Sequence, residues 1–137
     1  NLLGRLTAIE NVALPLLYRG FPTTKRNQAA RAMLERVGLT ERCYYYPRQL
    51  SGGQTQCVAI ARALVNQPEI IIADEPTGNL DPETSDEIMQ LLFHICKDYN
   101  TTIIMATHDY MVINKFPARM LKTERGKVWD NASIEMS

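Results

Sequence analysis

The sequence has little of what marks membrane-spanning and exported proteins. Its apolar runs, such as residues 70–73 and 103–106, are strand-sized and far shorter than the roughly 20 residues that a bilayer-spanning helix needs. Its first residues also lack the basic stretch followed by an apolar stretch that is typical of an export signal. We therefore expect a soluble chain.

Cysteine pairs and an excess of charge are missing too. Cys43, Cys57 and Cys96 form no C-x-x-C pair, which indicates reduced thiols in a cytosolic protein rather than a disulfide framework or a zinc site. Lys+Arg and Asp+Glu total 15 each, so the net charge is zero and gives no electrostatic reason to propose a nucleic acid partner. Hydrophobic residues make up 45% of the 137 residues, which is enough for the core of one domain.

The first half of the sequence predicts three helices. A capping box at residues 7–10 begins a helix to about residue 18, which Pro15 should kink or shorten. A second helix is expected over about residues 24–37, with Gly38 as its C-terminal stop. Ser51, followed three residues later by a glutamine, predicts a third helix to about residue 65.

The second half alternates strands and helices. Residues 69–74 form a β-branched run that is typical of a strand buried on both faces of a parallel sheet, and residues 101–107 predict a second buried strand. Asp81-Pro82 should open the helix between them, as N-cap and N1. After a short helix, residues 120–129 predict a hairpin.

The tail beyond Asn131 has the composition of a frayed end, and Pro117 should close the short helix. The order of elements predicts an α/β fold in which a helical part precedes the core.

Two adjacent carboxylates follow the first predicted strand. Ligands gather at the carboxyl ends of parallel strands, so Asp74 and Glu75 have the right place for different tasks. Asp74 can hold Mg²⁺, and Glu75 can orient or deprotonate a water that attacks a γ-phosphate. For the pair alone, a solvated acidic strand end is the commoner explanation.

Ser51-Gly52-Gly53-Gln54 stands at a predicted helix start. Glycines there let backbone N–H groups approach a phosphate closely, and the helix dipole favours negative charge. A loop that merely caps the helix explains these four residues equally well when they are taken alone.

A histidine follows the second predicted strand. His108 would share the sheet edge of Asp74 and Glu75 if the strands are parallel neighbours, and it could then donate a hydrogen bond to a γ-phosphate oxygen. A lone histidine is more often structural, which is how we interpret His94. Asp81 is at least an N-cap.

Taken together and in order, these motifs resemble one family. Residues 49–109 contain L-S-G-G-Q, then I-I-I-A-D-E-P-T-G-N-L-D, then M-A-T-H-D. This series resembles the signature motif, Walker B motif, D-loop and H-loop of ABC ATPases. Residues 1–20 and the P-T-G-N-L-D loop are similar to the lipoprotein-release and macrolide-export ATP-binding subunits. The M-A-T-H-D motif with K-F-P-A-R-M-L-K resembles the cell-division ATP-binding subunit.

The resemblance implies the C-terminal portion of a P-loop NTPase (ABC ATPase) fold. Residues 1–66 would form the helical signature subdomain. Residues 67–137 would form part of a mainly parallel RecA-like core, with the Walker B motif, D-loop, H-loop and C-terminal hairpin. The implied activity is that of an ATPase with ATP and Mg²⁺ as its ligands.

The resemblance also implies a role for each candidate residue. Residues 51–54, that is Ser51, Gly52, Gly53 and Gln54, would contact the γ-phosphate of an ATP held by an opposing subunit. Asp74 would serve the Mg²⁺, through water, and Glu75 would be the catalytic carboxylate. Asp81 would communicate across the dimer, and His108 would be the switch histidine.

The implied partners are a second ATPase subunit and a membrane protein. The two ATPase subunits would pair head to tail, close on ATP and open on hydrolysis. The helical subdomain would dock on an integral membrane permease or a cell-division membrane subunit. The location would be cytoplasmic, peripheral on the inner face of the cell membrane, with no nucleic acid partner.

The sequence departs from the family pattern at two places. No G-x-x-x-x-G-K-[ST] phosphate loop occurs, and the single Gly-Lys pair, Gly126-Lys127, is followed by valine. Since the chain also begins with Asn1 rather than Met, we expect a piece of a longer protein that is inactive by itself. Thr55-Gln56-Cys57 stands where the family usually has Gln-Gln-Arg, which would weaken activity unless cysteine is simply tolerated there.

Two other functions stay open on the sequence alone. A truncated, non-catalytic paralogue could dock on a membrane subunit, which the missing phosphate loop favours and the presence of Glu75 and His108 disfavours. A soluble ABC ATPase acting on DNA or ribosomes is disfavoured by the neutral charge.

Overall fold

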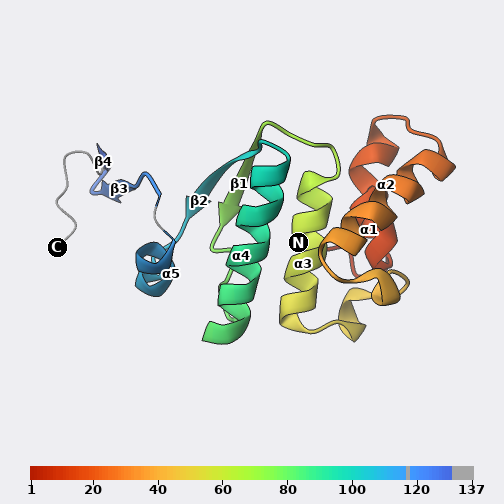
Figure 1. Cartoon of the computed structure of the whole chain (residues 1–137), viewed down its shortest axis with the longest axis horizontal. Coiled ribbons are helices and arrows are strands. Elements are labelled where there is room, and N and C mark those ends of the chain that lie inside the picture. The colour runs from red at the N-terminus through yellow and green to blue at the C-terminus, as the bar shows by residue number, and fades with distance from the viewer. Residues whose placement is uncertain (117, 131–137) are drawn as a thin grey trace. The chain divides into compact units, whose positions relative to one another are not determined.

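A computed structural model describes residues 1–116 and 118–130 of the chain. The chain divides after Thr107 into two compact units, residues 1–107 and residues 108–137 (Figure 1). The predicted α/β class is confirmed, because helices and a parallel pair of strands make up the first unit. The predicted boundary between residues 66 and 67 stays a prediction.

The first helix, α1 (Ala8–Tyr18), begins at the predicted capping box. The Thr7 hydroxyl oxygen accepts from the Glu10 N–H at 3.4 Å, and the Glu10 carboxylate accepts from the Thr7 N–H at 3.0 Å. The helix runs through Pro15 to Tyr18, so the expectation that Pro15 shortens it is wrong. Val12 and Leu16 are buried on either side of Pro15, and this packing holds the helix against the core despite the lost N–H.

Two further helices complete the helical part. The predicted helix over residues 24–37 is α2 (Thr23–Arg36), and Gly38 ends it with φ +77, a conformation that glycine adopts without strain. Two short 3₁₀ helices, Thr40–Arg42 and Pro47–Gln49, lead to α3 (Gly52–Leu64).

Strands β1 (Ile70–Asp74) and β2 (Thr102–Ala106) are parallel neighbours, as predicted. Helix α4 (Pro82–Asp98) connects them and begins at the expected cap Asp81. In register, Asp74 lies opposite Ala106. The residues that follow β1 and β2 therefore leave the pair at the same edge.

The prediction that β1 is buried on both faces is wrong. Ile71 is 9% exposed and belongs to the helical core, whereas Ile72 on the opposite face is 80% exposed. Ile103, in register with Ile71, also packs on that core, whereas Ile104 is 53% exposed. Side chains alternate across a strand, so the helices of the first unit cover one face of the pair, and no residue in 1–107 buries the other face.

The core of the first unit lies between the four helices and the covered face of the strands. Its centre includes one polar side chain, the fully buried Asn11. The Asn11 amide oxygen accepts from the Leu3 N–H at 2.8 Å, and the amide nitrogen lies within 3.1 Å of the carbonyl oxygens of Leu3, Leu6 and Thr7. Burial of the amide is tolerated because these bonds replace those to water.

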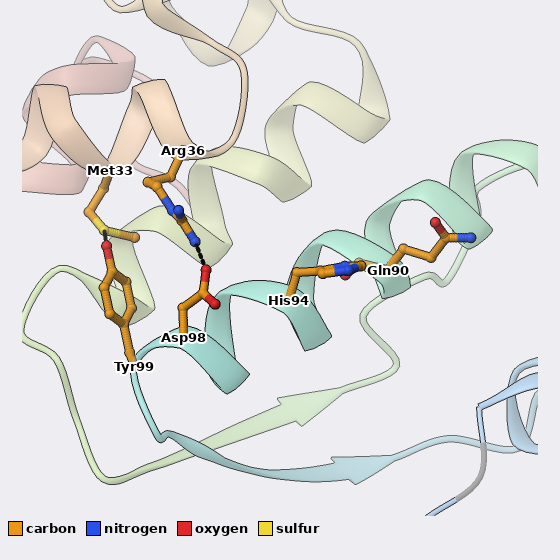
Figure 2. A network of polar contacts seen from close by, with 6 residues as sticks. All are labelled: Met33, Arg36, Gln90, His94, Asp98 and Tyr99. Atoms are coloured by element: carbon orange, nitrogen blue, oxygen red, sulfur yellow. Dashed lines mark hydrogen bonds and ion pairs between the residues drawn. The ribbon is translucent and has the colours of Figure 1, made fainter.

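A second polar network joins the C-terminal ends of α2 and α4 (Figure 2). Arg36 forms an ion pair with Asp98, and its guanidinium carbon lies 5.7 Å from the centre of the Tyr99 ring. The Tyr99 hydroxyl also donates to the sulfur of Met33 at 3.7 Å. These contacts are exposed or half-buried, so they orient the two helix ends more than they stabilise the core.

The second unit contains α5 (Tyr110–Lys115) and the hairpin of β3 (Leu121–Glu124) and β4 (Lys127–Asp130). The hairpin is confirmed: Arg125 and Gly126 have φ +49 and +76, as a two-residue hairpin turn of type I′ requires. The calls on Pro117 and on the tail beyond Asn131 lie outside the described residues. No helix in residues 1–116 and 118–130 has the length and apolar character needed to span a membrane.

Candidate functional site

Glu75 occupies an unusual backbone conformation directly after β1. Its φ is +47, a left-handed value that costs a non-glycine residue free energy. The following residue is Pro76, which further restricts the backbone of the residue before it. Such a conformation persists only when its surroundings hold it, and it is found preferentially at functional sites.

Backbone hydrogen bonds on both sides hold Glu75 in place. Its N–H donates to the Ala106 carbonyl at 2.8 Å, which extends the β1–β2 pairing by one residue. Its carbonyl accepts from the Gly78 N–H at 3.0 Å and closes a tight turn. A side chain at Gly78 would place Cβ 3.3 Å from that carbonyl oxygen, so a glycine suits the close approach. Proline second and glycine fourth are favoured in such a turn.

The Glu75 side chain is held as well. The Thr107 hydroxyl donates to Glu75 Oε2 at 3.0 Å, across 32 positions of sequence. Both side chains are half-buried. Sequence reasoning did not single out Thr107. The sequence did contain a signal for it: Thr107 is a hydroxyl residue one position beyond the second strand, and Glu75 is one position beyond the first strand at the same edge.

Asp74 is exposed at the last position of β1. Within residues 1–116 and 118–130, no group of three or more His, Cys, Asp or Glu residues could hold a metal ion. Mg²⁺ typically takes one or two carboxylates together with water and substrate phosphates, and Asp74 has the chemistry of one such ligand.

The glycine-containing turn at residues 51–54 is the N-cap and first turn of α3. The Ser51 hydroxyl oxygen accepts from the Gln54 N–H at 3.1 Å, and the Gln54 amide oxygen accepts from the Ser51 N–H at 2.9 Å, which confirms the predicted capping box. Ser51 and Gly52 are exposed. A ligand can therefore reach this helix start, as the anion-site hypothesis requires.

Both glycines of this turn also pack against the loop that begins α4. A Cβ at Gly52 would lie 3.2 Å from Leu80 Cδ2, and a Cβ at Gly53 would lie 2.7 Å from Thr84 Cγ2. Helices α3 and α4 start at the same end of the unit (Figure 1). The structure thus gives Gly53 a packing reason in addition to the ligand reason suggested by the sequence.

Asp81 is the predicted N-cap of α4. Its carboxylate accepts from the Thr84 N–H at 3.2 Å. Hydrogen bonds from the side chain and the N–H of Thr84 lower the pKa of this exposed carboxyl, because they favour its ionised form. Asp81 and the turn at residues 51–54 are brought together, since Thr84 contacts both.

Cys57 lies on α3, where the family usually has arginine. Burial, with a smaller contribution from the nearby Glu87 carboxylate, raises the pKa of its thiol to about 11. A thiol in this setting stays protonated at neutral pH and packs as a small apolar group. The substitution has therefore removed a positive charge without adding a reactive nucleophile.

The two histidines lie in different units of the chain. His94 is exposed on α4, and its Nδ1 lies 2.8 Å from the Gln90 carbonyl oxygen of the same helix (Figure 2), which agrees with a structural role. His108 is the first residue of the second unit. Its proposed place beside Glu75 stays a prediction.

The described residues thus form two groups at the ends of their elements. One group, Glu75 with Thr107 and the neighbouring Asp74, offers a positioned carboxylate and a ligand for a cation. The other, residues 51–54 with Asp81, offers helix N–H groups, a hydroxyl and a capped helix start. Each group is of a kind that phosphate-ester chemistry uses.

Comparison with known proteins identifies the relatives of this chain. The ABC transporter family model matches residues 1–78. An uncharacterized ABC transporter ATP-binding protein of Thermotoga maritima is 50% identical over 115 residues, which make up 84% of this chain and 49% of that protein. The lipoprotein-releasing system ATP-binding protein LolD of Hyphomonas neptunium is 42% identical over 130 residues, 95% of this chain and 57% of that protein.

A solved structure extends the likeness to the fold. The dimeric post-hydrolysis state of the ATP-binding cassette MJ0796, bound to ADP and Pi, has a TM-score of 0.78 and 39% sequence identity. The match covers 95% of this chain and 59% of that chain. The chain spans about half the length of the curated relatives cited above.

Proposed function

The chain belongs to the ABC transporter family and has the ABC ATPase form of the P-loop NTPase fold, and from this premise we propose that the full-length protein hydrolyses ATP to drive a membrane partner. The observation that carries the proposal is the conformation of Glu75. A carboxylate at the end of a parallel strand sits on a strained backbone that hydrogen bonds hold on both sides. This is the arrangement expected of a group that must point at a reacting water.

The proposed chemistry assigns the water to Glu75. Its carboxylate orients the water and accepts a proton as the oxygen attacks the γ-phosphorus. Asp74 would hold Mg²⁺ through water, and the bound ion would supply positive charge to the phosphate oxygens. His108 donates a hydrogen bond to the γ-phosphate, a role that depends on its reaching the edge of Glu75.

A second ATPase subunit completes the proposed site. The N–H groups and hydroxyl at residues 51–54 bind the γ-phosphate of an ATP held mainly by the opposing subunit, so the site forms only in a head-to-tail dimer. The exposure of Ser51 and Gly52 supports this part. Asp81, which shares Thr84 with the turn, transmits the state of one site to the other.

The proposed membrane partner is an integral permease or a membrane subunit of the export, lipoprotein-release or cell-division type. A LolD protein among the relatives is named for a lipoprotein-releasing system, which supports this class of partner. The protein then acts at the cytoplasmic side of the membrane, docked through residues 1–66.

ATPase activity of the full-length protein tests the proposal. Glu75→Gln keeps the shape of the side chain and removes the base, so kcat should fall by about a hundredfold or more. Glu83→Gln removes an exposed carboxylate from the first turn of α4 and serves as the matched control with unchanged kcat. The 137-residue chain alone should show no turnover.

Two results would contradict the proposal. Full turnover by Glu75→Gln would remove the assigned base. A full-length protein that binds its membrane subunit but never hydrolyses ATP would be a docking module instead.

A further inference from the structure

We propose that Thr107 is a positioning residue for hydrolysis, whose hydroxyl holds one oxygen of the Glu75 carboxylate and so helps to orient the carboxylate that acts on the attacking water. This inference rests on the proposed catalytic role of Glu75. It starts from the hydrogen bond of 3.0 Å between the Thr107 hydroxyl and Glu75 Oε2.

The end of β2 fixes both the backbone and the side chain of Glu75. The Ala106 carbonyl accepts from the Glu75 N–H at 2.8 Å, and the next residue, Thr107, bonds the carboxylate. Two consecutive residues of one strand end therefore constrain Glu75 at two points. Backbone bonds do not restrict the side-chain torsions of a glutamate, and a hydrogen bond to the carboxylate does.

The chemistry of the bond suits a carboxylate that must act as a base. The Thr107 hydroxyl donates to Oε2, and a hydrogen bond to one carboxylate oxygen limits rotation of the whole group. Because geometric errors at a reacting group are costly to the rate, loss of this bond should lower turnover more than ATP binding.

Another threonine, just before β2, provides a matched comparison. Thr101 is buried, and its hydroxyl donates to the Pro68 carbonyl at 2.9 Å. That bond ties two backbone segments together and touches no candidate catalytic group. A valine at residue 101 and a valine at residue 107 each remove one hydroxyl from an end of the same strand and keep the β-branched shape.

The test compares these variants in the full-length protein. We expect Thr107→Val to lower kcat about tenfold with an unchanged KM for ATP. Thr107→Ser, which keeps the donor, should stay within about twofold of the wild type. Thr101→Val should lower the Tm without lowering kcat. Thr107→Ala should show the same loss of kcat as Thr107→Val and guards against poor folding of the valine variant.

A positioning role further requires that Thr107 act through Glu75. In a Glu75→Ala background, Thr107→Val should therefore cause no additional loss of the residual rate. An additional loss would overturn the inference, as would a Thr107→Val enzyme with normal kcat or a Thr107→Ser enzyme as impaired as Thr107→Val.

The same data separate this inference from the proposed function. If wild-type protein hydrolyses ATP and Glu75→Gln does not, but Thr107→Val equals the wild type, only the role of Thr107 is wrong. If the wild type itself is inactive, the proposed function fails, and the Thr107 inference fails with it.

Discussion

Gly53→Ala separates two reasons why a glycine stands at the start of α3. The packing reason is the side chain of Thr84, whose Cγ2 would lie 2.7 Å from the new Cβ. The ligand reason is close approach of the backbone to a phosphate. A change in stability reports the first reason, and a change in ATPase rate at restored stability reports the second.

The magnitude follows from the contact. Overpacking of this kind costs about 1–3 kcal/mol, while alanine in place of glycine in a helix returns about 1 kcal/mol. The free energy of unfolding should therefore fall by about 1 kcal/mol. Rotation of Thr84 would relieve the contact, but it would also move the side chain that hydrogen bonds to Asp81.

Urea denaturation with a compensating substitution is the assay. Thr84→Ser removes Cγ2 and keeps the hydroxyl, so the double variant Gly53→Ala/Thr84→Ser should be at least as stable as Thr84→Ser alone. Gly52→Ala is the matched control. Its Cβ would lie 3.2 Å from Leu80 Cδ2, the end of a flexible side chain, so Gly52→Ala should not destabilise the fold.

Two outcomes would refute this reasoning. If Gly53→Ala is as stable as the wild type, the contact with Thr84 does not constrain residue 53. If the double variant is stable and retains full ATPase activity in the full-length protein, no phosphate approaches this backbone closely enough to require glycine.

Three further perturbations have expected outcomes. Asn11→Asp places a carboxylate against the carbonyl oxygens that the amide nitrogen now contacts. It should lower the free energy of unfolding by about 3 kcal/mol or more, as measured by urea denaturation. This loss should exceed the loss caused by Asn11→Ala. The pKa of Cys57 is raised to about 11 in the folded chain, so the contribution of its protonated thiol to the free energy of unfolding is fully present below the unfolded pKa of roughly 9 and is lost as pH rises toward the folded value. A Cys57→Ala variant should therefore lose less stability over this pH interval than the wild type. A parallel decline of both proteins would contradict the assignment. Since both side chains of the Arg36–Asp98 pair are exposed, Asp98→Asn should lower the Tm slightly at low salt and leave it unchanged in about 1 M NaCl, and a large loss at high salt would show a buried interaction instead.

The sequence was sufficient to predict features that depend on neighbouring residues. The capping boxes at Thr7 and Ser51 and the cap at Asp81 are set by side chains within three positions of one another. The hairpin turn at residues 125–126 is likewise determined by local backbone preferences. These features hold whatever else the chain packs against.

Features that depend on distant residues could not be predicted in the same way. The exposure of Ile72 depends on which elements cover each face of the strands, and a β-branched run does not specify that. The bond between Thr107 and Glu75 joins residues 32 positions apart, and the packing of Gly53 on Thr84 joins two helix starts. The candidate residues were found by motif, but their supporting contacts required the fold.

Dimerisation on ATP tests the central claim most directly, because a carboxylate at one strand end and a glycine-containing turn of a second subunit are assigned to the same nucleotide. The full-length Glu75→Gln protein, measured by light scattering, should double its mass when ATP and Mg²⁺ are added, and Ser51→Arg should prevent the doubling without preventing ATP binding to the monomer. A protein that binds ATP and remains a monomer, or a Ser51→Arg variant that still dimerises, would contradict the account.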